Sequence, residues 1–468
     1  MKILAADFGD ARTGLAICDT RETIATPIGN VSEKGMKRMA EGTARAAAER
    51  RAERVVVGLP VNMNGTEGPR AEKCRKFARL LKEMLPDGVS VVMWDERSST
   101  VTAHRYLVEC DVHGKKQRER IDPESAAVIL ESYISYRRNN QTENTREVFI
   151  MNKRERVMAA YNGQKPDRVP SAFWYHFPEG YAYGEDAVKA HVEFFRNSGT
   201  DLCKVMNDNL CVKDPDINCA ADWDKLKFYT MDEDIVKRQV QLVKRVVEEV
   251  DHKAVVIATI HGLVACFFHT FGGPNIYDED GTLIGRHLRE NPEGFRHAME
   301  VLSDYIKKLS HLCIEAGADG IYFASLGGER RMFTDEEFAE YIAPYEIDIL
   351  NDIKDVPCFN VLHMCKGDLN LERYVNYPAK VLNWGVYEGN ISLEEGRKLF
   401  GEDKVYLGGM DDRDGVFVDG SIEEIKKTAK ECVDSFGWKN YILGADCTLP
   451  TNIDNERIRA AVEAAVID

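Results

Sequence analysis

The sequence has no long uninterrupted apolar run. It opens MKILAADFGDARTG, a short apolar stretch with acidic residues close behind it, and this lacks the long apolar region of a signal peptide. None of its 468 residues lies in an apolar stretch long enough to span a bilayer. These absences argue against export and membrane insertion and favour a cytoplasmic protein.

A disulfide framework is also absent. The 12 cysteines are scattered without regular spacing through a long chain, which favours a reducing compartment where any functional cysteines act as metal ligands or nucleophiles. An apolar content of 44% and a charged content of 30% are typical of soluble globular proteins. The length predicts more than one domain.

The net charge of −16 is unevenly distributed. Residues 1–150 hold 25 Lys and Arg against 22 Asp and Glu, whereas the remainder holds 37 against 56. A mildly basic front part can meet a polyanion, and an acidic rear part would repel one. This difference indicates two units with different partners.

The front part alternates apolar runs and amphipathic segments. Three runs at hairpin-like spacing come first, and helical and β-branched segments then alternate up to a final helix that begins near Asp122. The pattern predicts an α/β fold whose mixed sheet carries helices on both faces.

Carboxylates lie at the ends of these predicted elements. Asp7 ends the first strand, Asp95 and Glu96 end the last strand, and Asp122 begins the final helix. Functional groups of open α/β sheets gather at strand ends, and hard cations such as Mg²⁺ and Mn²⁺ prefer oxygen ligands. The alternative is that Asp122 only caps a helix and the other carboxylates face solvent.

Four ordered segments of the front part resemble the YqgF/RuvX-type family of Holliday junction resolvases. They are AADFGDARTGLA, VVVGLPVNMNGTEG, WDERSSTVTA and IDPESAAVILESYI. The resemblance implies an RNase H-like fold, a role in maturing the 5′ end of pre-16S rRNA, and metal binding by Asp7, Glu96 and Asp122. It leaves open whether the substrate is RNA or a branched DNA junction.

Basic residues near these carboxylates are candidate nucleic-acid contacts. Arg12 and Arg97 could contact phosphates, because a guanidinium group matches phosphate oxygens. Lys115 and Lys116 open a basic stretch just before Asp122 that could follow a nucleic-acid backbone. The alternative for each lysine is a solvated loop.

The rear part contains eight short apolar runs separated by helical or loop segments. They are VPSAFWYHF, DLCKVMND, AVVIATI, GIYFASL, VPCFNVLH, AKVLNWG, VYLGGM and YILGAD. Continuous apolar runs are typical of strands buried on both sides, so the pattern predicts a (β/α)8 TIM barrel. Its active site would lie at the C-terminal ends of the strands.

Two of these runs end in metal-ligating residues. The fifth run leads into His363 and Cys365, and the eighth leads into Cys447. One imidazole and two thiols suit Zn²⁺ and leave a fourth tetrahedral position for a substrate thiol. The alternative is that the cysteines are packing residues, which is the interpretation we give to the other cysteines.

The rear part resembles the uroporphyrinogen decarboxylase superfamily. The segments are RERVMAAYNGQKPDRVP, GADGIYFASLGG, APYEIDILNDI, VLHMCKGD, LGGMD and ILGADCTLP. Its zinc methyltransferases, which move a methyl group from a corrinoid protein to a thiol such as coenzyme M, carry an H-x-C…C motif that matches His363, Cys365 and Cys447. The segment SAFWYHFPEGYAYG lacks the arginines that bind porphyrinogen carboxylates in the decarboxylases. Since no D-x-H-x-x-G motif is present, the corrinoid would arrive on a separate protein.

Other polar residues near strand ends are weaker candidates. His176, His261 and His269 could contact substrate, and Asp411 could be a polar site group. The alternative, which we favour for the histidines, is that each is an ordinary loop or core residue; for Asp411 the alternative is a loop carboxylate.

The segment between the two parts reads like the start of a protein. We predict a front domain over 1–138, a polar linker over 139–150 and a barrel domain over 151–468. Arg146, Glu147 and Val148 could be encoded by a purine-rich ribosome-binding sequence just before the codon of Met151. The linker would then be a former gap between two genes, and CGN codons at Arg146 would exclude this hypothesis.

Two alternatives remain open from the sequence. The barrel could demethylate or decarboxylate another small molecule, and the front domain could bind nucleic acid without cleaving it.

Overall fold

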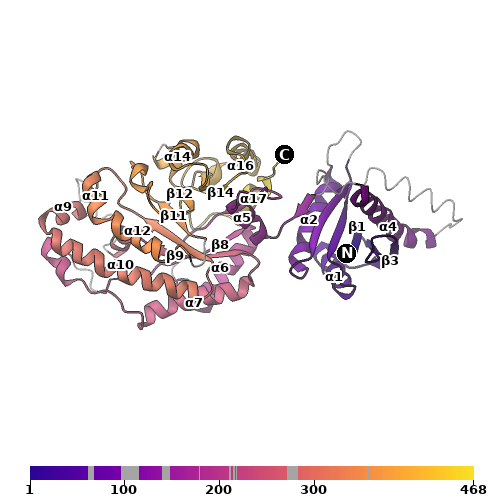
Figure 1. Ribbon diagram of the computed structural model, residues 1–468, viewed down its shortest axis with the longest axis horizontal. Helices are drawn as coiled ribbons and strands as arrows, with labels where there is room; N and C mark the ends of the chain where they lie inside the picture. The colour runs from indigo at the N-terminus through magenta and orange to yellow at the C-terminus, as the bar shows by residue number, and fades with distance from the viewer. Residues whose placement is uncertain are drawn as a thin grey trace. The chain divides into compact units, whose positions relative to one another are not determined.

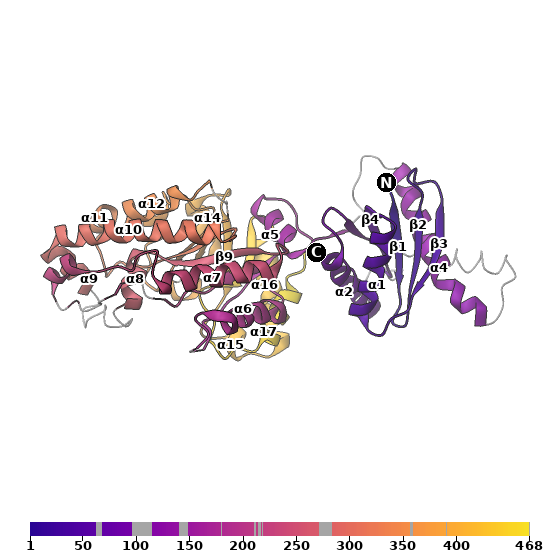
Figure 2. The same cartoon turned by 90° about the horizontal axis from the view of Figure 1, so that it is seen from below.

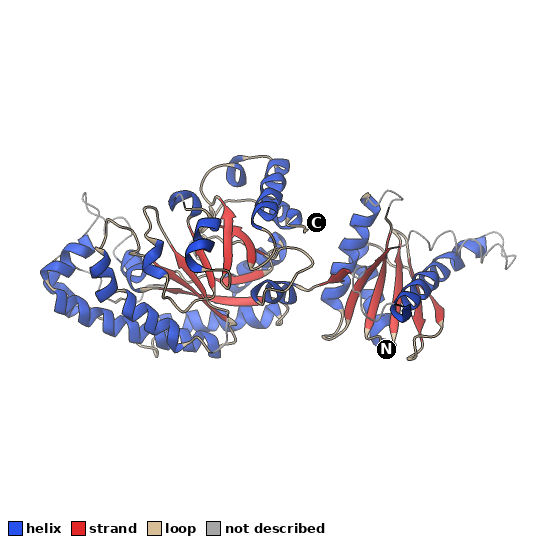
Figure 3. Ribbon diagram, turned by 45° about the horizontal axis from the view of Figure 1, so that its top comes forward, coloured by secondary structure: helices blue, strands red, loops and turns tan. Residues whose placement is uncertain are grey.

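A computed structural model describes residues 1–61, 68–95, 115–139, 148–178, 180–209, 212–213, 217, 219–270, 283–355, 359–389 and 391–467. The chain divides into two compact units, Met1–Asn152 and Lys153–Asp468. Each unit is described separately below, and their secondary structure can be followed in Figure 3.

The first unit contains a six-stranded mixed sheet in the order β3-β2-β1-β4-β5-β6. β1 and β3 are each antiparallel to β2, which lies between them. β4 and β5 continue in parallel from β1, and β6 is antiparallel to β5. The strands are β1 (Ile3–Phe8), β2 (Thr13–Cys18), β3 (Ala25–Val31), β4 (Arg54–Leu59), β5 (Ser90–Asp95) and β6 (Val148–Ile150).

Helices cover both faces of this sheet (Figure 2). Along β1, Leu4 and Ala6 pack with α1 (Met36–Glu49) and α2 (Pro69–Met84), whereas Ile3 and Ala5 pack with α4 (Lys115–Asn139). Side chains alternate across a strand, so a continuous apolar run supplies both layers. The predicted mixed sheet with two helical faces is confirmed.

The boundary between the units differs from the predicted linker. Residues 148–150 pair with β5 in the register Val91↔Ile150, Val92↔Phe149 and Met93↔Val148. The linker prediction was therefore wrong for these three residues, because their β-branched and aromatic side chains add an edge strand to the first sheet. Met151 and Asn152 also group with the first unit.

The second unit is a ring of eight parallel strands in the order β7-β14-β13-β12-β11-β10-β9-β8 (Figure 1). All eight predicted runs supply one strand each, which confirms the TIM-barrel prediction. The strands are β7 (Ser171–Ala172), β8 (Leu202–Val205), β9 (Val255–His261), β10 (Gly320–Ser325), β11 (Val361–Met364), β12 (Val381–Trp384), β13 (Val405–Met410) and β14 (Tyr441–Ala445).

Helices surround this ring, and its strands separate an outer core, shared with the helices, from an inner one. Three of them begin with a capping box, in which Thr334, Ser392 or Ser421 accepts a hydrogen bond from the backbone of the first turn. The α-helices are α5 (Lys153–Tyr161), α6 (Gly184–Ser198), α7 (Asp234–Val250), α8 (Leu263–Thr270), α9 (Leu283–Glu290), α10 (Pro292–Glu315), α11 (Asp335–Tyr341), α12 (Ala343–Asp352), α13 (Val386–Gly389), α14 (Leu393–Phe400), α15 (Val416–Asp419), α16 (Ile422–Phe436) and α17 (Asn455–Ala464). Short 3₁₀ turns lie at Ala220–Lys225 and Leu371–Tyr374.

A buried charge network joins the two ends of the ring, β7 and β8. The Asp201 carboxylate accepts hydrogen bonds from Arg156 at 2.6 Å, from Arg168 at 2.9 Å and from the Ser171 backbone amide at 2.8 Å. The Asp201 amide donates back to the Ser171 carbonyl at 2.8 Å. Each charge has a partner of opposite sign, which offsets the cost of removing it from water.

Within the described residues, no helix combines the length and the apolar character needed to cross a membrane.

Candidate metal centres

The three predicted metal ligands of the barrel lie together at the C-terminal ends of their strands. His363 belongs to β11, Cys365 follows that strand directly, and Cys447 lies two residues after the end of β14. Cys447 Sγ lies 3.4 Å from His363 Nε2 and 3.8 Å from Cys365 Sγ, and all three ligand atoms lie within 4.8 Å of one another. We call this group the barrel centre.

The spacing of the barrel centre fits a tetrahedral zinc ion. Zn–S bonds of about 2.3 Å and Zn–N bonds of about 2.0 Å at tetrahedral angles place two sulfurs ~3.8 Å apart and a sulfur and a nitrogen ~3.5 Å apart. The observed sulfur–sulfur and sulfur–nitrogen distances, 3.8 Å and 3.4 Å, are close to these edges. Three protein ligands leave a fourth position open, which is the arrangement of catalytic zinc sites.

A residue that the sequence did not reveal orients the histidine. Asn383 of β12 is fully buried, and its side-chain amide nitrogen donates to the carbonyls of Leu407 and Ala445 at 2.9 and 3.2 Å. Its oxygen therefore faces His363, whose Nδ1 donates to it at 2.6 Å. Nε2 is left unprotonated and directed at the two sulfurs, as a metal ligand requires.

Replacing Asn383 by alanine is expected to weaken zinc binding by about 10–100-fold, because His363 loses the hydrogen bond that fixes its ring. Competition with a chromophoric chelator measures the affinity. Asn291→Ala is the control, since Asn291 caps α10 and lies outside the barrel centre. Equal zinc affinities for Asn383→Ala and the wild type would remove the orienting role.

Two aromatic rings and the buried amino group of Lys204 lie close to the barrel centre. The Tyr322 ring stacks on His363 with centroids 5.2 Å apart and meets Trp174 edge-on. Lys204 Nζ lies 4.0 Å from the Tyr322 ring centroid and 4.9 Å from that of Trp174. Burial lowers the pKa of Lys204 to about 7, although the nearby thiol sulfurs and Asp208 oppose this shift.

Ionisable groups at and near the barrel centre have shifted pKa values. The hydrogen bond from Cys365, together with the nearby His363 ring, lowers the pKa of Cys447 well below its ordinary value. Burial and the Cys447 thiolate raise the pKa of Asp412 to about 6. Asp411, in contrast, accepts hydrogen bonds from the backbone amides of Arg413 and Asp414, which supports its interpretation as a loop carboxylate.

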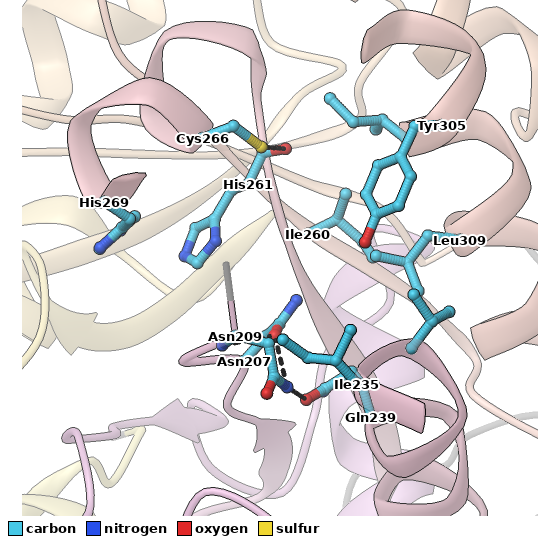
Figure 4. Close-up of a pocket in the computed structure, with 12 residues that line it drawn as sticks. Asn207, Asn209, Ile235, Gln239, Ile260, His261, Cys266, His269, Tyr305 and Leu309 are labelled. Carbon is cyan, nitrogen blue, oxygen red and sulfur yellow. Dashed lines mark hydrogen bonds between the residues drawn. The ribbon is translucent and has the colours of Figure 1, made fainter. Parts of the chain in front are cut away.

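The three candidate histidines do not join the barrel centre. His261 and His269 lie ring to ring, with centroids 4.2 Å apart, and line a separate pocket with Asn207 and Asn209 (Figure 4). The two asparagines are hydrogen-bonded to each other, and Asn209 also donates to Gln239 of α7. His176 lies elsewhere on the rim and donates from Nδ1 to Asp208 at 2.7 Å.

A buried carboxyl group supports the backbone behind Cys365. Glu346 of α12 is fully buried and accepts hydrogen bonds from Ser325 at 2.7 Å and Tyr377 at 3.0 Å. The Ser325 carbonyl in turn accepts from the Cys365 amide at 3.1 Å. Burial raises the pKa of Glu346 from 4.5 to about 7.

This raised pKa predicts a pH-dependent stability. The unfolded state releases the Glu346 proton at lower pH than the folded state, so the free energy of unfolding falls as pH rises from about 4.5 to about 7. Glu346 is thus expected to lower the free energy of unfolding by up to about 3 kcal/mol across this pH range, and its contribution no longer changes at higher pH. In Glu346→Gln this loss is absent, so the variant gains stability relative to the wild type as pH rises. Urea unfolding at pH 5 and pH 8 measures it, with the exposed Glu340→Gln as control; parallel pH profiles would contradict the prediction.

The first unit brings two of its predicted carboxylates together. Asp7 of β1 pairs with Gly14 of β2, and a side chain at Gly14 would collide with the Asp122 carbonyl at 2.0 Å. Glycine therefore lets α4 approach β2 beside Asp7. Burial raises the pKa of Asp7 to about 6, Arg70 opposes this shift, and Asp122 adds to it. The charge of Asp122 therefore acts on Asp7, and carboxylates that share a site in this way suit Mg²⁺ or Mn²⁺.

The remaining nucleic-acid candidates are only partly described. Arg12 donates from Nε to the Asp122 carboxylate, so the predicted phosphate contact pairs with a predicted metal ligand. Glu96 and Arg97 lie outside the described residues. Lys115 and Lys116 lie in the first turn of α4, and their side chains are outside the described part.

Comparison with known families covers both units. Residues 1–136 match the family model described as RuvX, Holliday junction resolvase, and residues 199–466 match that of uroporphyrinogen decarboxylase (URO-D). The chain belongs to both of these families. We refer below to its RuvX unit and its URO-D unit.

Individual relatives agree with these matches. The RuvX unit is 39% identical over 141 residues to a protein of Caldanaerobacter subterraneus subsp. tengcongensis named "Putative pre-16S rRNA nuclease", and the match covers 30% of this chain and 100% of that protein. A protein of Myxococcus xanthus with the same name is 41% identical over 143 residues, or 31% of this chain and 93% of that protein. The URO-D unit resembles the solved structure of a methyltransferase from Methanosarcina mazei, with a TM-score of 0.54, 16% identity and coverage of 67% of this chain and 98% of that one. This last likeness shows the fold.

Proposed function

We propose that the URO-D unit is a zinc-dependent methyltransferase that moves a methyl group from a corrinoid protein to a thiol. The observation that carries the proposal is the barrel centre, in which one imidazole and two thiols are spaced as the edges of a zinc tetrahedron. Bound zinc would supply a Lewis acid that holds a substrate thiol as its thiolate.

Residues around the barrel centre orient its imidazole and add charge near its sulfurs. Asn383 fixes the tautomer of His363, and the Tyr322 ring covers one face of that imidazole. The Lys204 ammonium adds positive charge near the thiolates. In the transfer, an electron pair of the substrate thiolate forms the bond to the methyl carbon, and the pair of the cobalt–carbon bond stays on the corrinoid.

Metal analysis and one transfer assay test this function. We expect near-stoichiometric zinc by mass spectrometry of the full chain, and methyl transfer from methylcobalamin to coenzyme M. A folded protein without zinc would overturn the zinc mechanism. A zinc protein that transfers no methyl group to thiols would point to demethylation or decarboxylation of another small molecule.

For the RuvX unit we propose metal-dependent cleavage of structured RNA or branched DNA. The observation that carries it is the approach of Asp122 to Asp7 that Gly14 permits, because paired carboxylates can hold ions that activate water and stabilise the leaving oxygen of a phosphodiester. The test is incubation with Mn²⁺ and two labelled substrates, an RNA with the 5′ extension of pre-16S rRNA and a four-way DNA junction. Binding without cleavage of either would identify a nucleic-acid-binding module instead.

A further inference from the structure

A histidine–carboxylate pair bridges the two ends of the strand ring at the barrel mouth. His176 follows β7 and Asp208 follows β8, the two strands at the ends of the strand order. The His176 Nδ1 donates to the Asp208 Oδ1 at 2.7 Å, and the two side chains are 45% and 34% exposed. Within the described part of the chain, the other ring nitrogen of His176 has no hydrogen-bond partner, so it can accept a proton.

Backbone pairing places His176 beside the segment that carries Cys447. Tyr175 forms a parallel bridge with Leu449, and the Leu449 amide donates to the Trp174 carbonyl at 3.0 Å. Neighbouring strands lie about 5 Å apart, so His176 is close to the residues that directly follow the metal ligand.

The alternation of side chains directs His176 toward the bore of the barrel. Trp174 belongs to the inner core, and Tyr175 packs against the outer core. His176 therefore lies on the same side as Trp174, whose ring contacts Tyr322 and thereby the layer that contains His363. Met206, the residue directly after β8, also belongs to the inner core, and Asp208 follows it by two residues.

The other titratable groups around this pair are less suited to accept a proton. Burial lowers the pKa of His261 well below its ordinary value, and burial followed by repulsion from His176 lowers that of His269. Neither ring has a carboxylate hydrogen-bonded to it in the described residues. Besides His176 itself, the groups whose charges act on the pair or on its neighbours are Asp208, Lys204, His269 and Lys366.

We propose that His176, held by Asp208, accepts the proton that a substrate thiol loses when it binds at the barrel centre. The sulfur–hydrogen bond breaks, its electron pair stays on sulfur, and the proton forms a bond to His176 Nε2. Asp208 fixes the tautomer with Nε2 unprotonated and stabilises the imidazolium. This role rests on the proposed methyltransferase function.

Proton counting tests the role independently of turnover. Coenzyme M is titrated into the zinc-loaded full chain by calorimetry in two buffers of different ionisation enthalpy, which gives the protons released per thiol bound. The wild type is expected to retain part of the thiol proton on His176 and to release less than one proton per thiol bound. His176→Gln should release more, up to one full proton per thiol bound. Methyl transfer to coenzyme M is expected to slow about 100-fold or more in His176→Gln.

Matched variants separate this role from a general effect of substitution. His311 makes the same kind of exposed pair with Asp352, at 2.6 Å and with 43% and 39% exposure, so His311→Gln should behave like the wild type. Asp208→Asn keeps the imidazole but loses the carboxylate, and should slow transfer and shift its pH profile.

Specific outcomes would overturn the role. Equal proton release and equal transfer rates in His176→Gln and the wild type would exclude His176. A change in proton release in Lys204→Met but not in His176→Gln would assign the proton to Lys204 instead. In the Co²⁺-substituted wild type, Cys365 and Cys447 give a thiolate-to-metal absorption band, which coenzyme M should strengthen. No increase on adding coenzyme M would overturn the proposed function together with this role. A normal increase with unchanged proton release and transfer in His176→Gln overturns the role alone.

Discussion

Replacing Cys447 by serine is expected to remove zinc from the URO-D unit and to abolish methyl transfer to thiols. Within the barrel centre, the Cys447 sulfur lies close to both other members, 3.4 Å from the His363 nitrogen and 3.8 Å from the Cys365 sulfur. A serine hydroxyl stays protonated near neutral pH and is a poor ligand for zinc, so two effective ligands would remain. The affinity should fall by well over about 100-fold, since even a lost orienting hydrogen bond costs 10–100-fold.

The control for this variant is another partly buried cysteine of the same unit. Cys432 donates from its thiol to the Gly409 carbonyl at 3.2 Å and does not belong to the barrel centre. Cys432→Ser should therefore keep its zinc. Mass spectrometry of the intact metal complex compares both variants with the wild type. Full zinc occupancy in a folded Cys447→Ser protein would show that the metal is bound elsewhere.

The sequence was sufficient to predict the barrel and the three residues that form the barrel centre, because these features are local. Each strand is a continuous apolar run, and each residue of the barrel centre lies within, or no more than two residues after, one of two such strands. Asn383 was not predictable, since its role depends on four strands meeting. From β12, its amide group bonds the carbonyls of Leu407 on β13 and Ala445 on β14 as well as His363 on β11. A polar residue inside an apolar strand was the available signal, and it applies equally to Lys204.

The boundary between the two units shows a different limit of sequence reasoning. The polar residues after 138 correctly suggested an end of the last helix, and α4 ends at Asn139. The following residues 148–150 form β6 only because β5 offers a free edge, and this partner lies more than fifty residues earlier in the chain. A short strand whose pairing is long-range carries little local signal.

Replacing Asp7 by asparagine is expected to have opposite effects on activity and stability in the RuvX unit. Cleavage in Mn²⁺ should fall by at least about 100-fold, because the amide cannot supply the charge that a hard cation requires. Stability should rise. The pKa of Asp7 is raised from 3.8 to about 6, chiefly by burial, so the ionised carboxylate destabilises the folded state once the pH exceeds that range.

The expected gain follows from the sign of this shift. The free energy of unfolding of the wild type falls as pH rises from about 4 to about 6, while asparagine has no proton to lose, so at pH 7.5 the variant should be more stable by about 1–3 kcal/mol. Asp10→Asn is the control, because Asp10 is 74% exposed and pairs with Lys73 at the surface. Thermal unfolding at pH 5 and pH 7.5, beside the cleavage assay, checks both effects.

The combination of results distinguishes a functional carboxylate from a structural one. An inactive variant that is also destabilised at neutral pH would mean that Asp7 stabilises the fold, and its loss of cleavage would then say little about metal binding. A stabilised and inactive variant has only one physical explanation within this site: the unit keeps a buried charge at a cost in stability because an ion offsets that charge during cleavage. A stabilised variant with full cleavage would exclude Asp7 as a metal ligand.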